Sequence, residues 1–94
     1  MKDFSLKVGD IFVHQKTSGI YTFDGLIYST KTNNAEMAYH NQEGESFTRE
    51  MGEFFGYTED KKKRFLPMEE FLNKYKHVEL THTDDGKLIF THKE

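Results

Sequence analysis

The sequence predicts a mainly β protein with one short helix, folded as a small, strongly bent antiparallel sheet or an SH3-like barrel of three hairpins. Short runs rich in β-branched and aromatic residues alternate with glycine-containing turns, which is the pattern of consecutive hairpins. Phe and Tyr together number 14, against 13 for Ile, Leu and Val, so the core must consist largely of bulky rings. At 94 residues without cysteine, the chain is expected to form one domain, residues 1–94, without disulfides.

The first hairpin is predicted to join residues 11–16 to residues 20–29 across Thr17-Ser18-Gly19. Gly25 interrupts the second of these strands and indicates a bulge or a bend. Apolar residues alternate in the segment 1–9, which indicates a short edge strand ahead of the first hairpin.

The second hairpin is predicted to join residues 36–41 to residues 45–50 across Gln42-Glu43-Gly44. A three-residue loop ending in a left-handed glycine determines which residues face each other. This register gives two cross-strand pairs, Tyr39 with Phe47 and Met37 with Arg49.

The third hairpin is predicted to join residues 77–83 to residues 87–92 across Asp84-Asp85-Gly86. A two-residue loop would place apolar side chains opposite polar ones on both faces. A three-residue loop gathers the apolar side chains on one face, and a slip of one residue would reverse the faces, so the three-residue loop is predicted. The apolar face then consists of Val78, Leu80, Leu88 and Phe90.

A single helix is predicted at about residues 67–76, with Pro67 at its first position. Its apolar residues fall at i, i+3, i+4 and i+7, and its charges complement the helix dipole. The apolar stripe consists of Met68, Phe71, Leu72 and Tyr75.

The segment 47–67 combines aromatic rings with a run of bases and divides into three parts. Residues 47–50 continue a strand. Residues 51–56 form either a short helix capped by Thr48 or a loop, and the rings of Phe54 and Phe55 are expected to lie in the core or in an interface. Residues 57–64 contain Tyr57 and the bases 61–64, which form either a solvated turn or an anion-binding surface. The insertion 51–64 is therefore expected to carry the variable site.

Composition argues against several function classes. The formal net charge of −3 makes duplex-DNA binding unlikely, because such binding needs a broad basic footprint. Apolar runs are too short to span a membrane, and the N-terminus has no signal-peptide core, so a cytoplasmic protein is expected. Common catalytic and nucleotide-binding motifs are absent and the histidines are scattered, so no enzyme, metal site or cofactor is predicted.

Several motifs resemble the small bacterial and phage domains of unknown function in the family numbered 1653. The family's pattern is matched by Phe12-x-His14-x-Lys16, Tyr21, Tyr39 and Pro67-Met68-Glu69-x-Phe71. The resemblance implies a small, strongly bent SH3-like barrel and no established activity. The chain departs from the pattern at Arg64 and Leu66, and by its extra length between Tyr39 and Pro67.

The leading functional hypothesis is a non-catalytic binding protein for a small anionic ligand, most concretely a nucleotide. In size, β-rich character and ring-heavy surface the chain is similar to the phage anti-CBASS sponges, which sequester cyclic-nucleotide immune signals. Because a domain this small cannot enclose a nucleotide, a homo-oligomer with a pocket between subunits is expected. The candidate ligand-binding residues are His14, Lys16, Tyr39, Arg49, Tyr57, Thr58, Lys62 and Arg64.

Two alternatives remain open at this stage, an SH3-like protein-interaction module and a single-stranded nucleic-acid-binding protein. His14 also has two interpretations. It is either a half-buried strand histidine bonded to neighbouring backbone, or a donor to a ligand phosphate or base edge.

Overall fold

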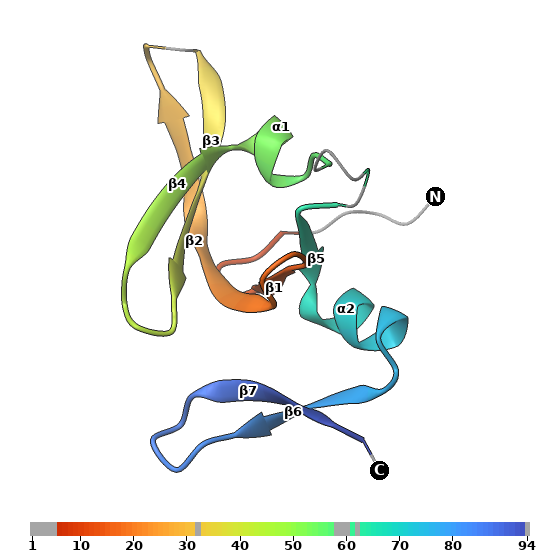
Figure 1. Ribbon diagram of the computed structural model, residues 1–94. Coiled ribbons are helices and arrows are strands. Elements are labelled where there is room, and N and C mark those ends of the chain that lie inside the picture. The colour runs from red at the N-terminus through yellow and green to blue at the C-terminus, as the bar shows by residue number, and fades with distance from the viewer. Residues whose placement is uncertain (1–5, 32, 58–60, 62, 94) are drawn as a thin grey trace.

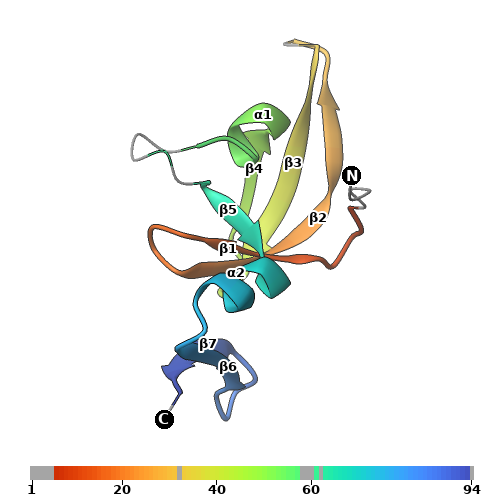
Figure 2. The same cartoon turned by 90° about the vertical axis from the view of Figure 1, so that its right-hand side faces the viewer.

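The computed structural model describes residues 6–31, 33–57, 61 and 63–93, and contains one five-stranded sheet, one two-stranded sheet and two short helices (Figures 1 and 2). The five-stranded sheet has the order β4-β3-β2-β1-β5 and is antiparallel throughout. The elements are β1 (Ile11–His14), β2 (Gly19–Ser29), β3 (Asn34–Asn41), β4 (Ser46–Glu50), α1 (Met51–Phe54), β5 (Phe65–Pro67), α2 (Met68–Lys74), β6 (Val78–His82) and β7 (Leu88–His92).

The mainly β class is confirmed, with 52% strand and 13% helix among the described residues. A strongly bent antiparallel sheet is compatible with the structure. Within the described part of the chain the sheet does not close into a barrel, and β4 and β5 are its two edges. The third hairpin was expected to belong to the same sheet, but β6 and β7 form a separate sheet that lies beyond α2 (Figure 1).

The predicted registers of the second and third hairpins are confirmed. Tyr39 pairs with Phe47 and Met37 with Arg49 in the second, while in the third Leu80 pairs with Phe90. The closing glycines of the two turns, at positions 44 and 86, both have φ of 87°, the left-handed conformation that the three-residue loop requires.

The first hairpin differs from its prediction. His14 pairs with Gly19, so the connection consists of residues 15–18, and Ser18 rather than Gly19 is left-handed, with φ of 59°. The backbone N–H of Ser18 donates to the carbonyl of His14 at 2.7 Å and closes the hairpin there, while on the β5 side the N–H of Gln15 donates to the carbonyl of Arg64 at 2.9 Å. The Thr17 hydroxyl then accepts the N–H of Gly19 and closes the turn.

Two further local predictions were made for β2 and for the N-terminal segment. The bulge at Gly25 is confirmed, because the register shifts between Phe23 and Gly25, whose φ is 150°. The expected edge strand in 1–9 is not formed by residues 6–9, where Lys7 and Asp10 close a turn instead. Residues 1–5 lie outside the described part.

Both helices are short, and one unpredicted strand separates them. Residues 51–54 are helical, with Glu50 rather than Thr48 at the N-cap position. Helix α2 is shorter than the predicted 67–76, because Pro67 ends strand β5 with an extended ψ of 146° and the helix starts at Met68. Strand β5 was not predicted. It pairs with β1 and places Phe65 beside His14.

The core has two parts on opposite faces of the sheet. On one face lie Phe12, Phe23, Met37, Tyr39, Phe54 and Phe65, and on the other Val13, Leu66 and Phe71. Helix α1 covers the first face through Phe54, whose ring stacks on Phe65 at 4.1 Å between centroids. Helix α2 and the β6–β7 hairpin cover the second face, where Phe71 contacts Phe90.

Truncation of Phe54 should strongly destabilise the fold. Its side chain is fully buried, so Phe54→Ala removes a whole ring and leaves a cavity, and the free energy of unfolding should fall by about 3–5 kcal/mol. Chemical denaturation followed by circular dichroism measures this change. Tyr57→Ala is the matched control, because Tyr57 is 61% exposed and its removal should change stability by less than about 1 kcal/mol. Equal losses in the two variants would contradict the assignment of Phe54 to the core.

Candidate ligand-binding site

The sheet face covered in part by α1 carries, beside the helix, an open pocket of about 170 Å³, here called the Arg49 pocket. All five strands of the main sheet and the β1–β2 turn contribute to it. Its lining residues are His14, Thr17, Tyr21, Tyr39, Phe47, Arg49 and Phe65.

Strand registers bring these side chains to one face. Tyr39 is paired with Phe47 across β3 and β4, and their rings stack at 5.6 Å with an interplanar angle of 25°. His14 is paired with Phe65 across β1 and β5, and the two rings meet edge to face at 5.0 Å. Tyr21 lies between these pairs and contacts rings of both. The pocket wall is therefore a continuous aromatic surface.

Arg49 supplies a half-buried cation at this wall. Its Nε donates a long hydrogen bond of 3.4 Å to the Tyr39 hydroxyl, and its guanidinium carbon lies 6.0 Å from the centroid of the Phe65 ring. No carboxylate pairs with Arg49 among the residues that the structure describes. The remaining guanidinium N–H groups are thus available to an acceptor outside this part of the chain.

The surroundings of His14 favour its neutral form. Burial, and then the positive charges of Arg49, Arg64 and Lys16, lower the pKa of His14 from its ordinary value of 6.5. Its Nδ1 lies 3.3 Å from the Thr17 hydroxyl, which can donate to it. These surroundings therefore favour the uncharged imidazole, and a neighbouring anion would favour its protonation.

The candidate residues from the sequence fall into three groups. His14, Tyr39 and Arg49 line the same pocket. Lys16 and Arg64 do not line it, but their charges act on His14. Tyr57 lies outside the pocket, is 61% exposed and forms an isolated bridge with Lys63. Thr58 and Lys62 lie outside the described residues.

Four lining residues were not predicted as site residues. Phe47 could have been found, because the predicted register already placed it beside Tyr39. Thr17 and Tyr21 were indicated less directly, Thr17 by its place in a predicted turn and Tyr21 by its place in the family pattern. Phe65 had none, since its place beside His14 depends on the pairing of β1 with a three-residue strand about fifty positions later.

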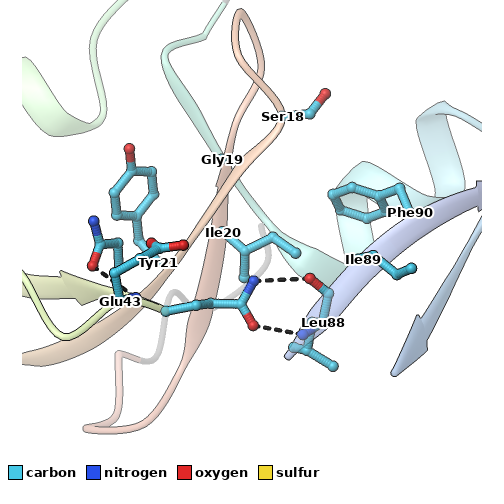
Figure 3. Close-up of a pocket in the computed structure, with 10 residues that line it drawn as sticks. Ser18, Gly19, Ile20, Tyr21, Glu43, Leu88, Ile89 and Phe90 are labelled. Carbon is cyan, nitrogen blue, oxygen red and sulfur yellow. Dashed lines mark hydrogen bonds between the residues drawn. The ribbon is translucent and has the colours of Figure 1, made fainter. Parts of the chain in front are cut away.

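A second, larger pocket of about 430 Å³ lies between the β1–β2 hairpin, the β3–β4 turn and strand β7 (Figure 3). It contains none of the candidate residues. Gln42 lines this pocket, and its amide forms two hydrogen bonds with the backbone of Leu88, donating to the carbonyl at 2.8 Å and accepting from the N–H at 2.6 Å, as the dashed lines in Figure 3 show. This side chain joins the β6–β7 hairpin to the main sheet.

Neither a metal cluster nor a membrane span is found in the described ranges. No group of three or more His, Asp or Glu side chains there could hold a metal ion. Within the same ranges, neither helix has the length and apolar character needed to cross a bilayer. No protein-family model, curated protein or solved structure matches the chain.

The charge of Arg49 should be visible in the titration of His14. Arg49→Met removes the largest electrostatic cause of the lowered His14 pKa and leaves burial in place, so the pKa should rise towards 6.5 without reaching it. Titration of the histidine ring protons by NMR measures this value. Lys87→Met is the control, because Lys87 pairs with Glu43 and is not among the charges that act on His14. An unchanged His14 pKa in Arg49→Met would show that the two side chains do not share a pocket.

Proposed function

We propose that this protein is a non-catalytic binding protein for a small anionic ligand that enters the Arg49 pocket. The observation that supports the proposal most is a half-buried guanidinium with no carboxylate partner in the described chain, set against an aromatic wall beside His14. An unpaired cation at such a site lacks a counter-charge. The oxygens of a phosphate provide that charge and match the planar donor geometry of Arg49.

A nucleotide is the ligand class that fits the rest of the pocket. The stacked rings of Tyr39 and Phe47, with Phe47 39% exposed, offer a surface on which a base can stack. The Thr17 hydroxyl adds a neutral hydrogen-bonding group beside the imidazole. Aromatic stacking combined with an arginine is the usual means of holding a base and its phosphate together.

The size of the pocket supports a ligand shared with a second copy of the chain. About 170 Å³ is below the roughly 300–1,000 Å³ of pockets that enclose a drug-sized ligand, so the pocket holds one phosphate or one base. The remainder of a dinucleotide would lie outside and be covered by another subunit. In its finer form, the proposal is a sponge of the phage type that sequesters cyclic dinucleotide immune signals.

An SH3-like protein-interaction module is the second candidate function. The observation that favours it is the partly exposed ring of Phe47 on β4, an edge strand of the described sheet. An extended peptide could pair with this edge and place a side chain in the Arg49 pocket. Lys61, Lys63 and Arg64 line neither pocket, so no comparable observation favours single-stranded nucleic acid.

Calorimetric titration tests the proposed function. A panel of cyclic di- and trinucleotides, 5′-mononucleotides and inorganic phosphate should contain at least one ligand that binds at micromolar protein concentration. Arg49→Met should weaken that binding about 10- to 100-fold, the value of a hydrogen bond to a charged group. Lys87→Met, remote from the pocket, should bind like the wild type. No heat change with any member of the panel would refute nucleotide binding.

The pH dependence of binding gives a second readout of the same site. A bound anion should raise the lowered pKa of His14, because it offsets the neighbouring positive charges. The complex then takes up a proton, so affinity should increase as pH falls from 8 towards 6. Cyclic dinucleotides suit this test, because their phosphodiesters do not titrate in this range. His14→Gln should abolish the increase, and an unchanged pH profile in this variant would exclude His14 from the ligand site.

A further inference from the structure

The outer half of strand β2 exposes three consecutive apolar side chains. Leu26, Ile27 and Tyr28 are 54%, 47% and 62% exposed. They lie on an arm, formed by the outer parts of β2 and β3, that extends beyond the rest of the sheet (Figures 1 and 2). Strand β1 pairs with β2 only over the residues from Gly19 to Thr22, so the outer β2 has an edge without a strand neighbour in the described chain.

The direction of the backbone groups on the arm follows from the register. The N–H of Asn41 donates to the carbonyl of Glu45, so Asn41 directs its backbone groups towards the β4 side. Because hydrogen-bonding direction alternates along an antiparallel strand, the even-numbered residues of β3, including Glu36, direct theirs towards β2. Ile27 is paired with Glu36, so its backbone N–H and C=O groups point towards β3, inside the arm.

Leu26 and Tyr28 therefore direct their backbone N–H and C=O groups to the open edge. This arrangement is self-complementary. When two such edges meet in antiparallel orientation, Leu26 of each copy faces Tyr28 of the other, and four backbone hydrogen bonds form. A two-fold axis then passes between the two Ile27 residues, which form a non-hydrogen-bonded pair with their side chains close together.

Residues 26–28 themselves lack the features that normally prevent such pairing, since the β2 bulge lies just before them at Gly25. Edge strands are usually protected by charged residues, proline or bulges. The two outer strands of the main sheet have such protection, with Arg49 and Glu50 in β4 and Pro67 in β5. From Gly25 to Thr30 the chain has no charged residue and no proline. An uncharged edge meets a second copy of itself without repulsion.

We propose that two copies of the chain pair antiparallel through residues 26–28 of β2 and so form one continuous sheet across a two-fold axis. The contact is small, so it belongs to the weaker class of interfaces and is concentration-dependent. It is distinct from the contact at the Arg49 pocket by which the proposed function expects a second subunit to cover the ligand. It uses no residue of the Arg49 pocket, so ligand binding and self-association are tested separately.

Sedimentation velocity over 1 μM to 1 mM tests the association. The wild type should shift from monomer to dimer over this range. Ile27→Lys places two ammonium groups opposite each other and should raise the dissociation constant at least tenfold. Ile89→Lys is the matched control, because Ile89 is 41% exposed in a strand of the other sheet, and it should dimerise like the wild type. Circular dichroism should show that both variants remain folded.

Cysteine cross-linking tests the register. The chain has no cysteine, so each variant carries one thiol. Ile27→Cys should form a disulfide-linked dimer on mild oxidation, because Cα atoms in a non-hydrogen-bonded pair are about 4.5 Å apart, within the range that a disulfide spans. Leu26→Cys faces Tyr28 instead of itself and should cross-link at least tenfold more slowly. Ile89→Cys should behave like Leu26→Cys.

Three results would overturn the proposal. The first is a wild type that stays monomeric up to 1 mM, which shows that the β2 edge does not pair with a second copy. The second is a dimer that persists unchanged in Ile27→Lys, which places the interface elsewhere. The third is equal cross-linking through positions 26 and 27, which rules out the two-fold register about Ile27.

Discussion

Phe12 and Val13 are neighbours in strand β1, and both are buried, with 3% and 0% exposure. Because successive side chains of a strand point to opposite faces, burying both requires a covering layer on each side of the sheet. Helix α1 provides one layer, and α2 with the β6–β7 hairpin provides the other. In the described chain these covering elements lie near β1. The outer part of the β2–β3 arm is therefore left uncovered, and its apolar side chains at positions 26–28 are exposed.

The Arg49 pocket lies at the solvent-exposed edge of the core that α1 covers, and it shares Tyr39 and Phe65 with that core. Phe65 stacks on Phe54 in the core, and it also contacts His14 and lies under Arg49. Tyr39 has the same double role, since its buried ring packs against Phe54 and its hydroxyl accepts a hydrogen bond from Arg49. The side chains that orient the cation therefore also hold the sheet together. Substitution of either ring would change stability and site geometry at once, whereas Arg49 and His14 can be varied with less effect on packing.

Local features of the sequence were sufficient to predict much of this fold. The hairpin registers followed from a glycine at a fixed turn position together with the gathering of apolar residues on one face, as the pair Leu80 and Phe90 illustrates. The first hairpin was misplaced because its turn is closed by the hydrogen bond from Ser18 to His14 and has a left-handed Ser18, which the position of Gly19 did not indicate. Strand β5 was missed because three residues show no periodicity. Of the residues that line the Arg49 pocket, those named from the sequence lie in the predicted hairpins. Phe65 was not named, because strand β5, which carries it, was not predicted.

The Gln42 amide, with its two hydrogen bonds to Leu88, takes the place of one residue of a β-strand. The two residues are 46 positions apart, whereas the β6–β7 hairpin closes over a few positions. A two-stranded hairpin by itself is only marginally stable in water, so its contacts with the rest of the protein are expected to stabilise it. The attachment also contains the ion pair of Lys87 with Glu43 at 3.9 Å and apolar contacts such as that of Phe90 with Phe71. Loss of the Gln42 amide would therefore weaken the attachment of the C-terminal hairpin and, with it, the cover over the second core.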